Sequence, residues 1–94
     1  MCLIVFSWDS HPDYQYILAA NRDEFYARPT KRAHQWSDVP IYGGRDEEAG
    51  GTWLAVNQDG CLAAVTNHRD PQHQVPNAKS RGELPVRWLQ TCND

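Results

Sequence analysis

The chain has few of the features that mark nucleic-acid-binding, membrane and secreted proteins. Its 94 residues carry nine Lys and Arg against twelve Asp and Glu, a formal net charge of −3, with no dense basic stripe. Phosphate backbones are bound by clustered positive charge, so we do not expect a nucleic-acid partner. No apolar run approaches the roughly 20 residues that span a bilayer, and no basic segment precedes the short N-terminal apolar run. We therefore expect neither a membrane span nor a signal peptide.

Cysteine is also scarce, and several well-known motifs are missing. The three cysteines, Cys2, Cys61 and Cys92, are odd in number and far apart. This pattern argues against a disulfide framework and favours a reducing compartment, so the cytoplasm is the expected location. The sequence has no C-x-x-C-H, G-x-G-x-x-G or P-loop order, and His68 and His73 are not spaced for a helical zinc site. We expect no metal and no covalently attached haem.

What is present suits one small globular domain over residues 1–94, because 40% of the residues are hydrophobic and four are tryptophan. Apolar runs at Cys2–Trp8 and Tyr14–Ala20 predict two strands, and the turn residues between them predict a hairpin. A second hairpin is predicted from Thr52–Val56 and Cys61–Thr66, which flank an Asp-Gly turn. The fold class is therefore α+β with antiparallel hairpins.

The remaining segments predict loops and one helix. Phe25–Pro40 is expected to be a long irregular loop, and the glycine-rich stretch from 41 to 51 is expected to turn twice. Ser80 and Glu83 have capping-box spacing, but Pro85 disfavours a helix that starts at Ser80, so the C-terminal helix should start later, near Pro85. A fragment of this kind would expose sheet edges, through which a homodimer is expected.

The N-terminus holds the most chemically informative residue. If Met1 is removed, the thiol and the free α-amine of Cys2 belong to the same residue, and an amine with a pKa of about 7.7–8.0 can accept the thiol proton. The first hairpin would bring Asn21-Arg22-Asp23-Glu24 back beside Cys2. The alternative is a buried structural cysteine at the start of an apolar strand.

Five blocks of sequence resemble the NRDE-motif family, also called the transport and Golgi organisation 2 family. They are Met1-Cys2, Ala20–Phe25, Gly50–Leu54, Thr66–Arg69 and Lys79–Leu84. The resemblance covers nearly the whole chain in the order found in that family, whose members are usually over twice this length. The family in turn is similar to the N-terminal nucleophile hydrolases. The resemblance therefore implies the N-terminal portion of an αββα sandwich.

The similar enzymes are cysteine-type acylases of linear amides, penicillin V acylase and bile acid hydrolase. The resemblance implies that Cys2 attacks an amide or acyl-thioester carbonyl, that Asp23 orients its amine, and that Asn67 lines the oxyanion hole. Arg22 would stabilise the thiolate, although the acylases place their arginine three residues before the aspartate, where Ala20 stands here. The expected substrate-binding residues are Asn21, Glu24, Trp53, His68 and Arg69.

Two functional hypotheses remain open, beside a third possibility that the chain is an incomplete domain with no activity of its own. The first is a hydrolase that needs no cofactor and takes a small acyl substrate. The second is a non-catalytic protein that binds and carries haem, acyl-coenzyme A or lipid, with Cys2 or the histidines at 11, 34, 68 and 73 as haem ligands. Each site residue also has a structural alternative: Asn21 and Asp23 would cap a turn, and Trp53 would belong to the core.

Overall fold

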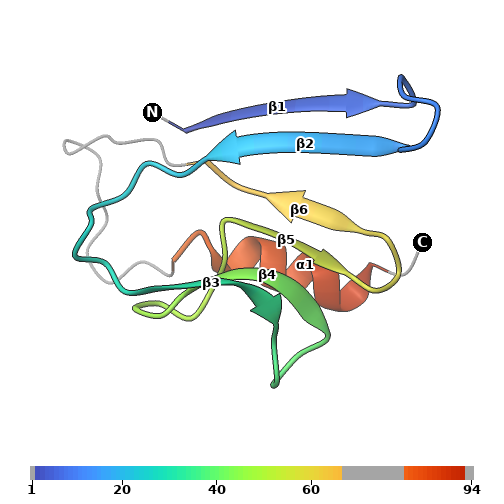
Figure 1. The fold of residues 1–94 in the computed structure, drawn as a ribbon. Helices are drawn as coiled ribbons and strands as arrows, with labels where there is room; N and C mark the ends of the chain where they lie inside the picture. The colour runs from blue at the N-terminus through green and yellow to red at the C-terminus, as the bar shows by residue number, and fades with distance from the viewer. Residues whose placement is uncertain (1, 67–79, 93–94) are drawn as a thin grey trace.

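The computed structural model describes residues 2–66 and 80–92, which form six antiparallel strands and one helix (Figure 1). Strands β1 (Leu3–Trp8) and β2 (Tyr16–Asn21) make a two-stranded sheet. A four-stranded sheet has the order β3-β4-β5-β6, and helix α1 follows it in the chain. The bounds are Thr30–Gln35 for β3, Ile41–Asp46 for β4, Leu54–Asn57 for β5, Leu62–Ala64 for β6 and Glu83–Thr91 for α1. The α+β class with antiparallel hairpins and a C-terminal helix is confirmed.

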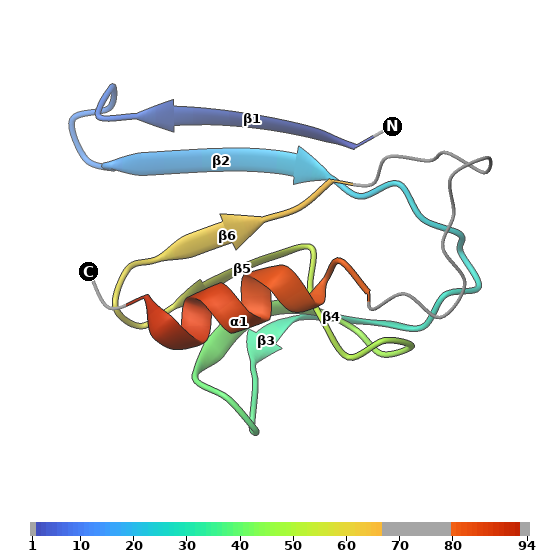
Figure 2. The same cartoon turned by 180° about the vertical axis from the view of Figure 1, so that it is seen from behind.

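The first hairpin forms as predicted, with β2 starting two residues later than expected. Its pairs run without a bulge from Leu3 opposite Asn21 to Trp8 opposite Tyr16. The turn is closed by the Asp9 N–H, which donates to the Gln15 carbonyl at 2.8 Å. Figures 1 and 2 show this hairpin along one side of the molecule, and neither strand comes close to the backbone of β3–β6 or α1.

Two predictions for the middle of the chain are wrong, because residues 25–40 contain β3 and the glycine-rich stretch contains β4. β3 is an edge strand, largely exposed and polar, with a bulge between Lys31 and His34, so it lacks the apolar alternation that identifies a strand. Gly43 lies within β4, where a Cβ atom would come within 2.6 Å of the Leu54 carbonyl oxygen. The glycine therefore permits close strand packing and does not mark a turn.

The second hairpin and the helix agree with the sequence more closely. β5 and β6 pair across a turn that contains Gly60 at a φ of 89°, although both strands are shorter than predicted. Helix α1 begins at Glu83, so Pro85 falls in the first turn, where a backbone N–H would have no partner within the helix. Ser80 Oγ accepts a hydrogen bond from the Gly82 N–H at 3.2 Å, just before the helix.

The core lies between α1 and one face of the four-stranded sheet (Figure 2). Its buried apolar residues are Trp36, Ile41, Ala55, Cys61 and Leu89. The side chain of Asn57 joins helix and hairpin: Nδ2 donates to the carbonyls of Leu89 and Cys92, both at 2.9 Å, and Oδ1 accepts from the Cys61 N–H at 3.0 Å. This amide fixes the C-terminal end of α1 against the β5–β6 turn.

The expectation that the cysteines form no disulfide is wrong. Cys61 and Cys92 are bonded, with a Cα–Cα distance of 6.3 Å, and Cys2 is the free cysteine among the described residues. The odd number of cysteines was a poor guide, because a single bridge uses two of the three. The bridge joins positions 31 residues apart, which meet only because the end of α1 packs on the β5–β6 turn.

Candidate functional site

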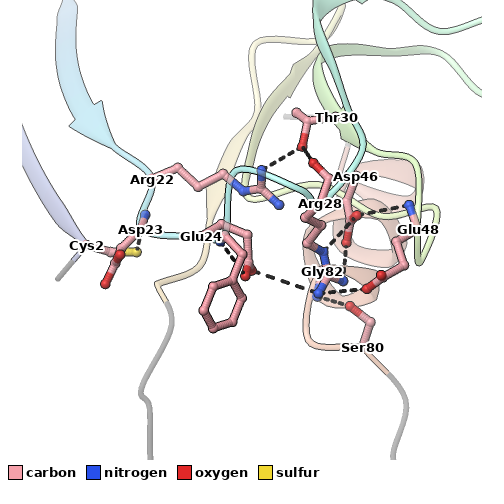
Figure 3. Close-up of polar contacts among 11 residues, drawn as sticks. Cys2, Arg22, Asp23, Glu24, Arg28, Thr30, Asp46, Glu48, Ser80 and Gly82 are labelled. Carbon is pink, nitrogen blue, oxygen red and sulfur yellow. Dashed lines mark hydrogen bonds and ion pairs between the residues drawn. The ribbon is translucent and has the colours of Figure 1, made fainter.

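Cys2 lies beside the segment that follows β2, as the hairpin predicts. Because Leu3 pairs with Asn21, the start of β1 and the end of β2 are adjacent, and the Leu3 N–H donates to Asn21 Oδ1 at 2.8 Å. Two residues further on, the Asp23 N–H donates to Cys2 Sγ at 3.4 Å (Figure 3). Both Cys2 and Asp23 are half-buried. The register of one hairpin thus brings the predicted nucleophile and the predicted aspartate into contact.

The contact between Cys2 and Asp23 has a defined chemical consequence. The backbone N–H of Asp23 is directed at the sulfur, so negative charge that develops there during a reaction would meet a hydrogen-bond donor. The half-burial of Cys2 also leaves part of the residue open to solvent. The geometry is therefore compatible with an accessible nucleophile, and it does not match the deeply buried structural cysteine considered as the alternative.

Arg22 directly precedes Asp23 in the sequence, but its side chain points away from Cys2. Its Nη1 donates to Thr30 Oγ1 at 2.7 Å, and the guanidinium carbon lies 4.3 Å from the centre of the Trp53 ring. Figure 3 shows Arg22 extending away from Cys2 toward Thr30 at the start of β3. The predicted effect of its charge on the Cys2 thiolate stays a prediction.

Trp53, predicted as a binding residue, has its ring held between two parts of the protein. Its six-membered ring lies against Gly44 of β4, where a Cβ atom would come within 2.5 Å of Cζ2 and Cη2. Arg22 contacts the same indole ring. Gly44 thus leaves room for the ring. The contact between Arg22 and Trp53 joins the Ala20–Phe25 block of the sequence to the Gly50–Leu54 block.

Glu24 belongs to an ion-pair network centred on Arg28, which sequence reasoning missed. Arg28 binds Asp46 in a bidentate manner, with Nε to Oδ1 at 3.1 Å and Nη2 to Oδ2 at 2.7 Å. Its Nη1 lies 2.9 Å from Glu48 Oε2 and 3.9 Å from Glu24 Oε2. Asp46 is only 7% exposed, and the hydrogen bonds from Arg28 hold the pKa of this carboxyl below its usual value.

The physical effect on Arg28 is reciprocal, since the Asp46 carboxylate raises the pKa of the guanidinium. An open depression of about 350 Å³ lies beside the network and is lined by Glu24, Phe25, Ala27, Arg28 and Glu48. No local signal could have identified this network, because Arg28 and Asp46 are 18 positions apart in a region predicted to be irregular. Only the pairing of β3 with β4 brings them together.

A second bidentate pair joins Arg45 of β4 to the segment that connects β3 with β4. Arg45 donates to both carboxylate oxygens of Asp38, at 2.7 and 2.9 Å, and its guanidinium lies 4.0 Å from the centre of the Trp36 ring. The hydrogen bonds from Arg45 lower the pKa of Asp38. This pair is remote from Cys2 in the chain, and we interpret it as structural.

Several predicted site residues lie outside the described part of the chain. These are Asn67, the predicted oxyanion donor, together with His68 and Arg69. Within residues 2–66 and 80–92, no group of three or more His, Cys, Asp or Glu side chains is arranged to hold a metal ion. The described part of the chain also contains no helix that is long and apolar enough to cross a membrane.

Comparison with known proteins gives consistent results for the whole chain. Residues 1–94 match the family model described as Transport and Golgi organisation 2. The chain is 46% identical over 102 aligned positions to the mouse Transport and Golgi organization 2 homolog and to the human Transport and Golgi organization protein 2 homolog. Each alignment covers 100% of this chain and 37% of the relative. The Drosophila melanogaster Transport and Golgi organization protein 2 is 42% identical over 88 positions, which cover 80% of this chain and 31% of that protein.

The chain therefore spans little more than a third of the length of these mammalian relatives. No solved structure matches it significantly.

Proposed function

Since the chain belongs to the Transport and Golgi organisation 2 family, we propose that it carries the nucleophile of a cysteine hydrolase that cleaves amide or acyl-thioester bonds. The observation that supports this proposal is the contact between Cys2 Sγ and the Asp23 N–H at 3.4 Å. It joins the first residue of the predicted mature chain to the residue predicted to hold its amine. The resemblance to N-terminal nucleophile hydrolases supplies the chemistry.

The proposed reaction begins after removal of Met1. The α-amine of Cys2 accepts the thiol proton, and the thiolate adds to the carbonyl carbon of the substrate. Collapse of the tetrahedral intermediate breaks the C–N or C–S bond, and the leaving amine or thiol takes the proton from the α-ammonium group. Water then hydrolyses the acyl-cysteine, with the amine as base. The oxyanion of both intermediates needs a neutral donor, for which Asn67 is proposed.

The proposed fold for the whole enzyme is an αββα sandwich, of which this chain forms the first part. The proposal is supported by the antiparallel strands and by the exposure of the first hairpin. Large side chains of β1, Leu3, Val5 and Trp8, are all 58–59% exposed. In an N-terminal nucleophile fold such a hairpin would belong to a sheet covered by further elements. The specificity of the enzyme would come from elements beyond this third of the relatives' length.

The haem-carrier hypothesis gains no support from the described histidines. His11 lies in the β1–β2 turn and its Nδ1 accepts from the Asp13 N–H at 3.1 Å. His34 lies on β3 with its Nδ1 2.7 Å from the Arg32 carbonyl. These two residues lie on separate elements and each contacts a nearby backbone group, so the two described histidines are not arranged as a pair of haem ligands. We derive no step through haem, and a haem titration followed at the Soret band would test this hypothesis.

The test of the hydrolase proposal uses tag-free protein and the variants Cys2→Ala and Cys2→Ser. Mass spectrometry of the N-terminal peptide first establishes whether Met1 is removed. The protein is then incubated with a panel of acyl-thioesters and linear acyl amides. We expect an acyl adduct on Cys2 and a loss of turnover of at least about 10³-fold in Cys2→Ala, because removal of a catalytic nucleophile has effects of this size.

The matched control is Ser7→Ala, which removes a small polar group from the same strand but away from the site. It should retain turnover and acylation. Hydrolysis that is unchanged in Cys2→Ala would rule out the proposed nucleophile. A retained Met1 would rule out the amine-assisted mechanism, since Cys2 would then have no free α-amine.

A further inference from the structure

The hairpin register brings Asp23 near Cys2, and the segment that carries Asp23 is attached to the rest of the protein just after β2. β1 and β2 pair only with each other among the described strands, and neither comes close to the backbone of β3–β6 or α1. Arg22 is the first residue after β2, and its side chain contacts the four-stranded sheet. The residue that follows it is Asp23, whose N–H is the donor to Cys2 Sγ.

Two contacts fix the Arg22 side chain. One is the hydrogen bond from Nη1 to Thr30 Oγ1 at 2.7 Å, at the first residue of β3. The other is the contact with Trp53, whose ring centre is 4.3 Å from the guanidinium carbon. Cations lie over tryptophan rings because the face of the ring carries negative potential. The planar guanidinium of arginine suits both contacts at once, whereas a lysine ammonium would suit neither geometry as well.

The Trp53 ring is itself fixed, so the contact is not between two mobile surface groups. Gly44 leaves just enough room for the ring, and any larger residue at position 44 would displace it. The backbone of Trp53 is tied to the second hairpin, because its carbonyl accepts from the Val65 N–H at 2.9 Å. The path from the rigid sheet to the thiol is therefore Gly44, Trp53, Arg22, Asp23 and Cys2, each in contact with or next to the following one.

We propose that Arg22 and Trp53 are positioning residues for the Cys2 nucleophile: the stacking of Arg22 on Trp53 holds the end of β2 so that the Asp23 N–H reaches the sulfur. This proposal rests on the proposed function, and it differs from the prediction that Arg22 acts on the thiolate through its charge. The observed direction of the Arg22 side chain, toward Thr30 and away from Cys2, supports the positioning role (Figure 3). Trp53 then acts on the site without touching the substrate.

The experiment measures the rate of Cys2 alkylation by iodoacetamide against pH in the full 94-residue chain. The variants are Trp53→Leu, Trp53→Phe, Arg22→Gln, Arg22→Lys and the double variant of Trp53→Leu with Arg22→Gln. Free cysteine measured alongside gives the reference profile. Trp88→Leu is the matched control, because Trp88 is an exposed tryptophan on α1 whose element does not approach the first hairpin.

The alkylation rate of wild-type Cys2 at neutral pH is the reference for the variants. Trp53→Leu, Arg22→Gln and Arg22→Lys should each lower the alkylation rate at neutral pH by about two- to fivefold, the change in population that one cation–π contact supports. The double variant should be no slower than either single variant, since both remove the same contact. Trp53→Phe keeps an aromatic face and should retain most of the wild-type alkylation rate.

The outcomes separate the two roles of Arg22. If Trp53→Leu leaves the profile unchanged, the positioning proposal is overturned. If Arg22→Gln slows alkylation while Arg22→Lys behaves as the wild type, Arg22 acts through its charge, which also overturns the positioning proposal. Thermal melts of all variants show whether a change in the profile merely follows partial unfolding. A fall in rate that Trp88→Leu shares would also overturn the proposal.

Amide hydrogen exchange at Asp23 gives a readout that does not depend on reactivity. Its N–H donates to Cys2 Sγ, so we expect its exchange to be faster in Trp53→Leu by about two- to fivefold. If the wild-type thiol behaves as free cysteine but this exchange effect is present, the nucleophile proposal fails while the positioning of Asp23 by Trp53 stands. If exchange at Asp23 is unchanged, the positioning proposal fails.

Discussion

The first hairpin and the four-stranded sheet with its helix are held together in different ways. The sheet and helix share a core, a disulfide, a buried asparagine and two bidentate ion pairs. The hairpin of β1 and β2 has aromatic contacts such as Phe6 on Tyr16, with ring centres 5.9 Å apart, but most of its large side chains are exposed. The candidate nucleophile thus lies on the less covered region, while Trp53, one of the two residues proposed to position it, lies on the better packed one.

This difference shows where stability and chemistry reside in the described chain. A two-stranded hairpin by itself is marginally stable in water. Among the described residues, Arg22 attaches the end of this hairpin to the four-stranded sheet through Thr30 and Trp53. In the four-stranded region, by contrast, helix α1 packs on one face of the sheet and buries that face.

Asn57→Ala should have the largest effect, and it should be confined to the second region. The substitution leaves the Leu89 and Cys92 carbonyls and the Cys61 N–H without their partner. Each buried group that loses a partner costs about 1–3 kcal/mol, so we expect the free energy of unfolding to fall by about 3–5 kcal/mol. Chemical denaturation followed by tryptophan fluorescence measures this value.

Asn57→Asp is the matched variant, because it keeps the acceptor oxygen but loses the Nδ2 donor. We expect this variant to lose at least as much stability as Asn57→Ala, because its buried carboxylate would face the Leu89 and Cys92 carbonyl oxygens at the C-terminal end of α1. A value within 0.5 kcal/mol of wild type for Asn57→Ala, about the size of an ordinary surface substitution, would contradict the anchoring role of this amide.

Reduction of the Cys61–Cys92 disulfide should have the next largest effect. The bridge closes a loop with a sequence separation of 31, and loop-closure entropy gives a contribution of about 2–4 kcal/mol. Adding reductant should lower the melting temperature of wild type and of Cys2→Ser, but not that of Cys61→Ser with Cys92→Ser. A melting temperature that does not respond to reductant would show that the bridge does not constrain the fold.

The disulfide also bears on the predicted location. The cytoplasm was expected partly because no disulfide was foreseen, and this part of the reasoning no longer holds. The location stays a prediction. Mass spectrometry of protein alkylated during extraction from cells would show whether Cys61 and Cys92 are oxidised where the protein resides.

Asp46→Asn should destabilise the second region by about 1–3 kcal/mol at neutral pH, because Arg28 loses a buried charged partner. Arg28 lowers the pKa of Asp46 in the folded state, so the stabilisation is fully present above the unfolded value of about 3.9. It is lost as the pH falls through the lower folded pKa. The difference between wild type and variant should therefore shrink in acid, as urea denaturation at several pH values would show.

Glu48→Gln is the control for Asp46, since Glu48 contacts the same arginine but its side chain is 59% exposed. An exposed ion pair contributes about 0–1 kcal/mol, so this variant should remain close to wild type. Equal effects of the two substitutions would mean that burial of Asp46 does not decide the strength of the network.

Val5→Lys should have the smallest effect on stability but a clear one on association. Val5 is 59% exposed on β1, which pairs with β2 alone among the described strands, so it is placed to take part in the proposed homodimer. We expect a change in the free energy of unfolding within about 0.5 kcal/mol and a loss of dimer in sedimentation velocity. Tyr42→Lys, an exposed site on β4 inside the other sheet, should leave association unchanged. A dimer that survives Val5→Lys would argue against pairing through β1.

The sequence by itself determined the local elements with strong periodicity or turn signals. The hairpin that places Asp23 beside Cys2, the Asp-Gly turn before Cys61, and a helix that begins near Pro85 all follow from patterns within a few residues. The family also followed from short blocks of sequence. The meeting of Cys2 with Asp23 was predictable because antiparallel pairing across one turn fixes which residues are opposite.

Tertiary structure alone decided the contacts between distant segments. β3 and β4 were missed because an exposed, bulged edge strand has no apolar alternation and because Gly43 and Gly44 serve close packing that no local pattern reveals. The Arg28–Asp46 network and the Cys61–Cys92 bridge depend on strand order and on helix docking. The direction of Arg22 toward Trp53 has the same origin: a long side chain turns to whichever surface the fold places within reach, and that surface lies 31 residues further along the chain.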